Sequence, residues 1–186
     1  IELLKRDPLR QKALETVAEL ELPQGYLAAG FVRNLVWDHL HQKSVPTPLN
    51  DVDVIYFDTR EHDSQTYLEY ENVLRTRMPQ LNWQVRNQAT MHSRNGDLPY
   101  KSSVDAMSYW PEKETAVGVR IVDEGQYELV SAFGFDSLFD LKITHNTKRS
   151  FAIFEQRIAN KNWLKQWPKL EVRSYCPLKQ SDAADE

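Results

Sequence analysis

The sequence predicts an α/β domain in which a small mixed sheet is covered by helices. Short apolar runs of strand length alternate with longer stretches whose apolar residues recur at helical spacing. The chain has 186 residues, of which 41% are hydrophobic and 27% charged, so it is long enough to bury one substantial core. We therefore expect one domain over residues 1–180, followed by a flexible acidic tail at residues 181–186.

The first elements follow one another closely. Residues 7–20 form a predicted amphipathic helix, because their apolar side chains recur at helical spacing after Pro8, which suits a first helical turn. Residues 23–25 break this helix, and the apolar run Tyr26 to Ala29 has the length of a strand. A second helix is predicted from Gly30 to residue 39 or 41. The order is therefore strand, glycine turn and helix.

The next strand, predicted over residues 51–58, is unusual because it carries acids. Side chains alternate between the two faces of a strand, so Asp51 and Asp53 share one face while Val52 and Val54 occupy the other. Helix and strand patterns continue to alternate beyond it. The further expected elements are a helix at 64–78, a strand at 83–91, a short helix at 103–109, strands at 115–122 and 127–131, and a helix at 151–166.

Charge and cysteine content limit the partners and the compartment. The net charge is −4 with both signs interspersed, so no broad basic surface is predicted and duplex DNA is not an expected partner. A lone Cys176 cannot form an internal disulfide or a cysteine metal cluster, which favours a reducing, cytoplasmic location. No apolar run approaches the ~20 residues of a membrane helix, and the first residues show no signal-peptide pattern, so no membrane partner is expected.

The pair Asp51 and Asp53 is typical of a site for a hard cation. Two carboxylates at positions i and i+2 project side by side from a strand within reach of one ion. Mg²⁺ usually takes one or two protein carboxylates and completes its octahedron with waters and substrate phosphates, so the pair anticipates a triphosphate. Mn²⁺ is the alternative ion. A solvated strand end would show the same two residues, so the pair alone does not decide.

Gly30 supplies a second feature about twenty residues earlier. A residue without a β-carbon at the start of a helix lets a phosphate approach the backbone amides, where the helix dipole favours an anion. An isolated glycine here would indicate only a tight turn. The succession of strand, glycine, helix and acidic strand indicates a phosphate site next to a metal site.

These residues resemble the DNA polymerase beta-like nucleotidyltransferase superfamily, whose members carry a glycine turn followed by a strand with two metal-binding carboxylates. The stretch from Ala29 to Asn34 is similar to the Gly-Gly-x-x-Arg-Asp motif of the poly(A) polymerase and tRNA CCA-adding branch, with Ala29 for the first Gly and Asn34 for the Asp. At a finer scale the chain resembles a bacterial family of uncharacterised nucleotidyltransferase-like proteins. The segments that carry this resemblance are 29–38, 50–58, 83–92, 110–112 and 116–120. It implies a nucleotidyltransferase fold and a metal-nucleotide site.

One departure from the superfamily concerns catalysis. A third carboxylate usually stands on a later strand, yet residues 83–91 contain no acid and offer Asn87. An Asn oxygen can coordinate a cation but cannot act as a base. Asp105 is a further candidate ligand, although its surroundings predict a turn of helix. Phosphoryl-type transfer depends mainly on positioning and charge neutralisation, so two carboxylates still permit the reaction.

Basic side chains are the expected phosphate contacts, because a guanidinium matches phosphate oxygens. Arg33 is the strongest, since it lies one helical turn beyond Gly30; a salt bridge with Asp38 would be its structural alternative. Weaker candidates are Arg86, Arg94, Arg120 and His92, and the motif adds Asn34. One of the five tryptophans is able to stack a base, and the sequence does not say which.

The function predicted from these features is the transfer of a nucleoside monophosphate from a nucleoside triphosphate to an acceptor hydroxyl, with a divalent metal. The acceptor, a small molecule, an RNA or a protein, is not specified. The main alternative is a nucleotide-binding or regulatory domain that kept the fold and lost turnover with the third carboxylate. A metal-dependent glycosyltransferase also uses an Asp-x-Asp, but it does not need a glycine-turn helix just before the acidic strand.

Overall fold

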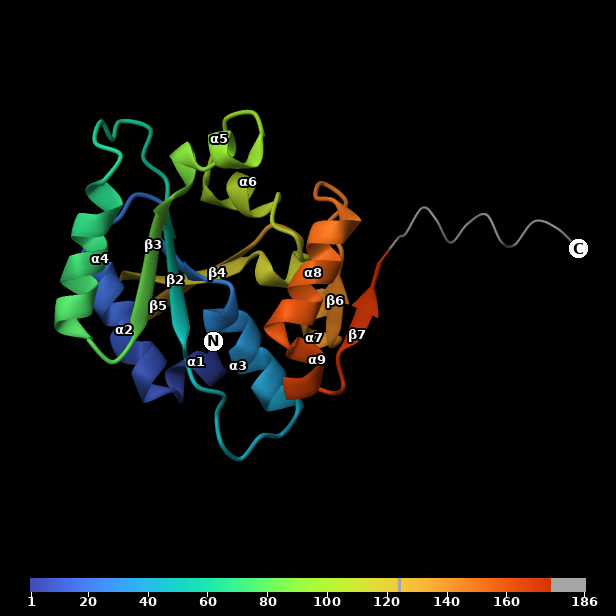
Figure 1. Cartoon of the computed structure of the whole chain (residues 1–186). Coiled ribbons are helices and arrows are strands. Elements are labelled where there is room, and N and C mark those ends of the chain that lie inside the picture. The colour runs from blue at the N-terminus through green and yellow to red at the C-terminus, as the bar shows by residue number, and fades with distance from the viewer. Residues whose placement is uncertain (124, 175–186) are drawn as a thin grey trace, which may run out of the picture.

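The computed structural model describes residues 1–123 and 125–174, and its centre is a five-stranded sheet (Figure 1). The strand order is β3-β2-β1-β4-β5, with β2 and β3 parallel and all other neighbours antiparallel. The strands are β1 (Tyr26–Ala28), β2 (Asp51–Tyr56), β3 (Asn82–Asn87), β4 (Val117–Asp123) and β5 (Gln126–Ser131). The prediction of a mixed sheet covered by helices is confirmed.

Alternation along β2 separates the core from the functional face of the sheet. Val52, Val54 and Tyr56 are fully buried in the main core. Asp51, Asp53 and Ile55 project from the opposite face, as the period of two predicts. Each apolar side chain buried on the core face contributes roughly 1.5–3 kcal/mol, so the register that presents both carboxylates on the other face is strongly favoured.

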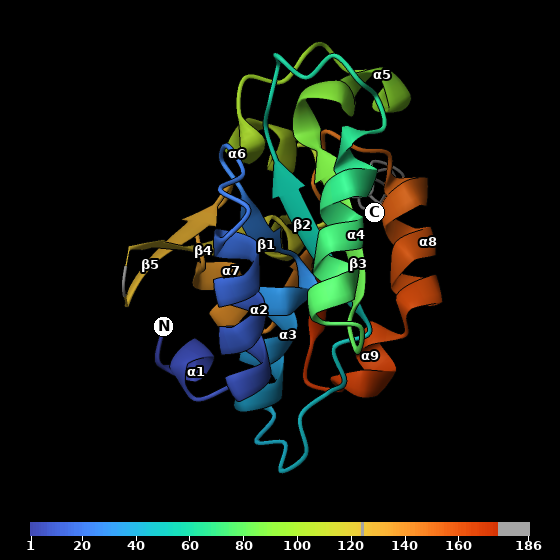
Figure 2. The same cartoon turned by 90° about the vertical axis from the view of Figure 1, so that its left-hand side faces the viewer.

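Three helices cover the core face, and Figure 2 shows two of them, α2 and α4, in front of the sheet. They are α2 (Pro8–Ala18), α3 (Gly30–Leu40) and α4 (Thr66–Arg77), and α1 (Glu2–Lys5) precedes them. Asp7 caps α2 by accepting a hydrogen bond from the Arg10 amide at 3.0 Å, and Pro8 stands at its start. The predicted helices are therefore present with shorter ends.

The turn from β1 into α3 is made by a strained residue. Ala29 has φ 58° and ψ −124°, a region that glycine populates and that costs other residues about 1–3 kcal/mol. Its amide donates to the Val117 carbonyl at 2.9 Å, and its carbonyl accepts the amides of Val32 and Arg33. These three hydrogen bonds hold the turn and fix where α3 begins.

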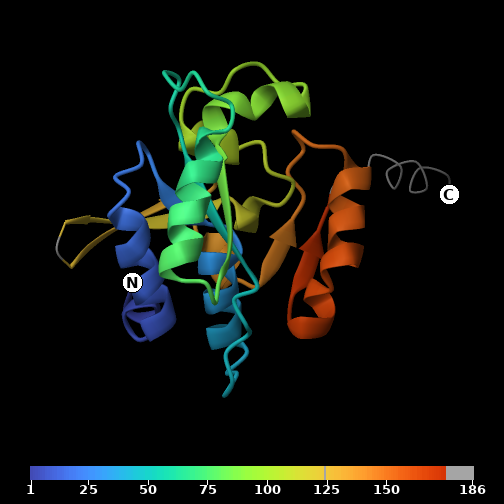
Figure 3. The same ribbon diagram turned by 60° about the vertical axis from the view of Figure 1, so that its left-hand side comes forward.

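Most of the C-terminal part of the described chain lies at the opposite end of the molecule from α1 and α2 in Figure 3. It consists of α7 (Asp136–Phe139), α8 (Phe151–Lys161), α9 (Trp163–Gln166) and a small parallel sheet of β6 (Lys142–Thr144) and β7 (Glu171–Arg173). The single helix predicted over residues 151–166 is wrong, because Asn162 adopts a left-handed conformation with φ 54° and divides it into α8 and α9.

The connection between β3 and β4 contains short helices. They are the 3-10 helix at Gln88–Thr90, α5 (His92–Asn95), α6 (Ser103–Met107) and the 3-10 helix at Lys113–Thr115. The strand predicted over residues 83–91 therefore ends earlier, at Asn87. The predicted tail at 181–186 and Cys176 lie outside the described residues. Within the described residues, no helix combines the length and the apolar character that crossing a bilayer requires.

Candidate active site

A cleft of about 490 Å³ opens on the face of the sheet that carries Asp51 and Asp53. One wall consists of β2, β3 and the start of α3; α8 and α9 form the opposite wall, and the segment around α5 and α6 closes one end. Figure 1 shows this arrangement, with α8 and β3 on either side of the region. The cleft thus joins segments that are more than 100 residues apart in the chain.

The two carboxylates differ in their surroundings. Asp51 is exposed at the start of β2 and accepts a hydrogen bond from Asn82 Nδ2 at 2.6 Å. Asp53 is partly buried, and its carboxylate has no hydrogen-bond donor among the described residues. Burial raises the pKa of Asp53, and the Asp51 charge raises it further against the opposing effect of Arg33. A desolvated acid without a donor, next to a second acid, is a donor set suited to a hard cation.

The N-terminus of α3 faces the same cleft and carries free backbone donors. Ala29 precedes the helix and provides no side-chain cap, and the amides of Gly30 and Phe31 have no acceptor among the described residues. A β-carbon on Gly30 would lie 3.1 Å from Asn34 Nδ2 and 3.3 Å from Arg33 Nη2. The glycine thus keeps open a space bordered by amide and guanidinium donors, which suits an anion.

Arg33 is held rigidly with one nitrogen left for a ligand. Its guanidinium lies 5.0 Å from the Trp37 ring and 4.6 Å from the Trp163 ring, Nη1 donates to Thr115 Oγ1 at 2.7 Å, and Nε donates to Asn34 Oδ1 at 3.2 Å. Nη2, beside Gly30, has no acceptor among the described residues. Burial lowers the pKa of Arg33 to about 10, so the side chain remains a cation at neutral pH.

Two further cations on α8 line the opposite wall, and sequence reasoning missed both. Arg157 Nε and Nη2 donate to the buried Glu112 carboxylate at 2.8–3.0 Å, and Thr115 Oγ1 also contacts Glu112, at 3.3 Å. Arg33 and Arg157 are therefore connected through Thr115 and Glu112. Lys161, one turn further along α8, is exposed and has no ion pair within the described chain.

Residue 84, rather than residue 87, stands next to Asp53. In the parallel pairing of β2 and β3, Asp53 is opposite Gln84, and Gln84 lines the cleft. Asn87 is buried on the other face, where its Oδ1 accepts the amides of Asp58 and Ala89 and its Nδ2 donates to the Asp58 carbonyl. The structure does not bring Asn87, which the sequence suggests as a catalytic residue, together with Asp51 and Asp53; that side chain stabilises the turns after β2 and β3.

The remaining candidates divide between the cleft and other places. Asn34 and Arg86 line it, although Arg86 is drawn toward α4 by Glu71, at 3.4 Å, and by the Tyr67 ring. Four other candidates are not cleft residues. His92 packs edge-on against Tyr100, Arg94 lies on α5, Arg120 pairs with Glu128, and Asp105 accepts the Lys101 amide at the start of α6.

The donor set therefore contains two acids. Among the described residues, no group of three or more His, Cys, Asp or Glu side chains is placed to hold a metal ion. Asp51 and Asp53 with a Mg²⁺ ion would leave most coordination positions for waters and phosphate oxygens, which is the usual arrangement for Mg²⁺ at a triphosphate.

The raised pKa of Asp53 predicts a stability gain when its charge is removed. The folded state binds the Asp53 proton more tightly than the unfolded state, so stability falls as pH rises from the ordinary Asp range through the raised folded pKa. Asp53→Asn should therefore melt at a higher temperature than the parent at pH 7 without divalent metal. The gain should vanish below the ordinary Asp pKa, where the parent is protonated in both states.

Thermal unfolding at several pH values measures this effect. Asp140→Asn is the matched control, since the Asp140 side chain is 74% exposed and its charge is already solvated. A lower melting temperature for Asp53→Asn at pH 7 would contradict the assignment of Asp53 as a desolvated ligand. Added Mg²⁺ should raise the melting temperature of the parent and leave that of Asp53→Asn unchanged.

A glycine turn that opens a helix N-terminus beside two carboxylates on the adjoining strand defines a nucleotidyltransferase-type domain. Residues 15–172 match the model of the family described as Nucleotidyltransferase, and the chain belongs to that family. The resemblance stated from the motif residues is thereby confirmed, and family membership assigns a nucleotide substrate and nucleotidyl transfer as the reaction class.

Comparison with solved structures gives the same fold. An NMR structure described as revealing a CCA-adding enzyme head domain is 33% identical, with a TM-score of 0.81 over 94% of this chain and 95% of that chain. A tRNA-processing enzyme in an apo form is 16% identical, with a TM-score of 0.50 over 90% of this chain and 46% of that chain, and supports the fold alone. The curated proteins give no significant match.

Proposed function

We propose that this protein transfers a nucleoside monophosphate from a nucleoside triphosphate to an acceptor hydroxyl, with Mg²⁺ or Mn²⁺ held by Asp51 and Asp53. The observation that supports it is the meeting of three features in one cleft: the two carboxylates, the uncapped N-terminus of α3, and the free Nη2 of Arg33. Bound metal would supply charge neutralisation on the transferred phosphate and on the leaving group.

The protein residues have separate parts in this reaction. The amides of Gly30 and Phe31 and Arg33 Nη2 bind the triphosphate, and Lys161 adds a cation from the opposite wall. The acceptor oxygen forms a bond to the α-phosphorus while the bond from that phosphorus to the bridging oxygen breaks, and pyrophosphate leaves. The acceptor proton passes to water, because the described residues that line the cleft include no acid besides Asp51 and Asp53.

RNA is the acceptor class that one observation favours. The 33% identical structure is described as a CCA-adding enzyme head domain, and this chain covers 95% of it. We therefore propose an RNA-terminal hydroxyl as the first acceptor to test, before small molecules and proteins. The net charge of −4 limits the electrostatic part of such binding, so contacts near the RNA end should dominate over an extended backbone interface.

Pyrophosphate release tests the reaction directly. The chain is incubated with Mg²⁺, each of the four nucleoside triphosphates and a panel of acceptors consisting of RNA ends, small hydroxyl compounds and proteins. We expect metal-dependent release of pyrophosphate that requires an acceptor and labels it with the nucleotide. If the chain binds nucleotide but no acceptor ever becomes labelled, the protein is better interpreted as a nucleotide-binding domain than as an enzyme.

A change at Gln84 distinguishes the enzyme from the nucleotide-binding domain, because Gln84 occupies the position beside Asp53 where a third carboxylate would stand. Gln84→Glu should increase turnover at neutral pH by roughly 10²- to 10⁴-fold, the usual contribution of a positioned general base. The pH dependence should also flatten, because the parent relies on solvent to take the acceptor proton. Rate against pH, measured for both proteins, provides the comparison.

Gln166→Glu is the matched control, since Gln166 also lines the cleft but lies on α9. It adds the same charge away from β3 and should leave the rate unchanged. If Gln84→Glu binds nucleotide with Mg²⁺ and releases no pyrophosphate with any triphosphate, the missing base was not the limitation. The interpretation as a nucleotide-binding domain without turnover would then hold.

A further inference from the structure

Trp110 differs from the other four tryptophans in having no aromatic or hydrogen-bonding partner for its ring among the described residues. Trp163 and Trp167 both pack on Trp37, with ring centroids 6.0 and 5.1 Å from it. Trp83 is fully buried and donates its indole N–H to the Met78 carbonyl. Trp110 is partly exposed and lines the cleft, and its ring has no aromatic, cationic or hydrogen-bonding partner among the described residues.

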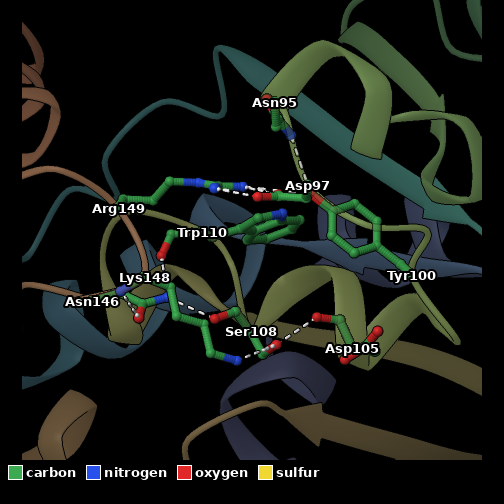
Figure 4. A network of polar contacts seen from close by, with 9 residues as sticks. All are labelled: Asn95, Asp97, Tyr100, Asp105, Ser108, Trp110, Asn146, Lys148 and Arg149. Atoms are coloured by element: carbon green, nitrogen blue, oxygen red, sulfur yellow. Dashed lines mark hydrogen bonds and ion pairs between the residues drawn. The ribbon is translucent and has the colours of Figure 1, made fainter.

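The backbone of Trp110 is, in contrast, tightly held. Its carbonyl accepts a hydrogen bond from Asn146 Nδ2 at 2.8 Å, its amide donates to the Met107 carbonyl at 3.0 Å, and the Pro111 carbonyl accepts the Asn146 amide at 2.9 Å. Figure 4 shows Asn146 bonded below Trp110 while no dashed line reaches the indole ring. A fixed backbone that holds a partly exposed ring at the edge of a cleft is the arrangement of a preorganised stacking residue.

An ion pair forms the border of the same end of the cleft. Arg149 donates to both oxygens of Asp97, at 2.9 and 2.5 Å, and the hydroxyl of Tyr100 also bonds to Asp97. Both charged side chains are largely buried, at 14% and 12% exposure. In Figure 4 the pair lies above Trp110, with Tyr100 at its side. The segment that carries Tyr100 is thereby fastened to the loop before α8.

Gln88 provides a polar group at this end of the cleft. The residue is 5% exposed and lines the cleft. Its side-chain amide atoms are not among the buried side-chain atoms of the described residues that lack a hydrogen-bond partner. An amide in the lining of the cleft can donate to or accept from a ligand that enters it.

The position of this end fits a nucleotide that extends from the phosphate site. Trp110 packs against the buried cluster that contains Ile55, and Ile55 stands two residues beyond Asp53 on the same face of β2, or about 7 Å along the strand. Gln88 follows directly on β3, where Arg86 is paired with Ile55. A ribose spans such a separation between a phosphate near Asp53 and a flat ring at Trp110.

We propose that Trp110 and Gln88 form a nucleobase subsite, in which the base stacks on the indole and its polar edge bonds to the amide. This inference rests on the proposed function, and it adds the group that recognises the base. The base is carried either by the incoming triphosphate or by the terminal nucleotide of the acceptor. Stacking by an aromatic residue tolerates every base, whereas an amide distinguishes their edges.

Titration calorimetry in the presence of Mg²⁺ tests the subsite with three probes: each nucleoside triphosphate, inorganic tripolyphosphate, and a short oligoribonucleotide without a triphosphate. Trp110→Leu should weaken binding of a base-containing probe roughly 5- to 150-fold and leave tripolyphosphate binding unchanged. Trp110→Phe should retain most of the affinity. Gln88→Met should reduce the differences in affinity among the four triphosphates.

The outcomes separate the two sources of the base. A loss confined to the triphosphates assigns the subsite to the incoming nucleotide, and a loss confined to the oligonucleotide assigns it to the acceptor. Phe139→Leu, on an aromatic that is 52% exposed outside the cleft, is the matched control and should change neither. If folded Trp110→Leu and Gln88→Met bind all probes like the parent, the subsite is overturned.

Failure of the proposed function would look different. It would appear as absent binding of tripolyphosphate and Mg²⁺, whatever residue stands at position 110. Tripolyphosphate binding that depends on Asp51 and Asp53, together with triphosphates that bind no more tightly than tripolyphosphate, would retain the phosphate site and reject the base subsite.

Discussion

Asp51→Asn with Asp53→Asn should reduce metal-dependent nucleotidyl transfer by at least about 10³-fold. Neutralising both acids removes the only carboxylates among the described residues that line the cleft. A bound metal contributes several kcal/mol of charge stabilisation, and each 1.4 kcal/mol corresponds to a factor of ten in rate. Pyrophosphate release and Mg²⁺-dependent nucleotide binding should both be lost in the double variant.

Asp105→Asn is the matched control, because Asp105 is the other acid that the sequence offers as a ligand, and it lies at α6 outside the cleft lining. Its rate should equal that of the parent. The melting temperature of the double variant should not fall, since removal of two adjacent charges relieves repulsion in the absence of metal. A large fall in the melting temperature of the double variant would show that Asp51 and Asp53 have a structural role. An equal loss of activity in Asp105→Asn would also contradict their assignment as the metal ligands.

Arg33→Met should weaken triphosphate binding by about 10- to 150-fold, the effect of losing roughly 1.5–3 kcal/mol from charged hydrogen bonds. Met retains much of the volume between the rings of Trp37 and Trp163 and removes the nitrogen beside Gly30. Arg33 forms no ion pair within the described chain, and without it Thr115 Oγ1 still donates to Glu112, which remains paired with Arg157, so the variant should stay folded. Titration with tripolyphosphate and Mg²⁺ measures the loss.

Arg120→Met is suited as the control for this variant. Arg120 also lies over an aromatic ring, 4.9 Å from that of Tyr26, but it pairs with Glu128 and does not line the cleft. The change should leave the dissociation constant of tripolyphosphate unaltered. An equal affinity for Arg33→Met and the parent would remove Arg33 from the phosphate site and leave only the helix N-terminus.

Much of the fold could be predicted because each central element has a strong local pattern. The Asp51–Tyr56 strand is marked by its alternation, and the helix after Gly30 by its periodicity. The strands β6 and β7 were missed because each has three residues and pairs only with a segment about 30 residues away. Such short strands exist through tertiary pairing and not through propensity.

Asn87, one of the residues predicted for the site, lies away from Asp51 and Asp53 for a reason visible in the sequence. Asn87 and Arg86 are consecutive residues of one strand and so must face opposite sides. Trp83 and Val85 are apolar and identify the core face, which leaves Gln84 and Arg86 on the face of the carboxylates. The same alternation that grouped Asp51 with Asp53 thus indicates Gln84 and excludes Asn87.

Other site residues gave no usable signal in the sequence. Arg157 and Lys161 lie about 100 residues beyond Asp53 on a helix whose orientation depends on the packing of Trp163 and Trp167 against α3. Among the described residues, Trp110 is distinguished from the other tryptophans by a ring that has no aromatic or hydrogen-bonding partner. Only a structure reveals this difference. Long-range placement, unlike local periodicity, is decided by the whole core.

The composition of the cleft from both ends of the chain has a consequence for biosynthesis. During translation, at about 5–20 residues per second, the strand β2 with Asp51 and Asp53 emerges several seconds before Arg157 and Trp163. Until α8 and α9 dock, Arg33 lacks the second of its two rings and the cleft lacks a wall. The nascent chain therefore exposes the face with Asp51 and Asp53 before it can retain a nucleotide. Nucleotide binding would then indicate that α8 and α9 have docked and that folding is complete.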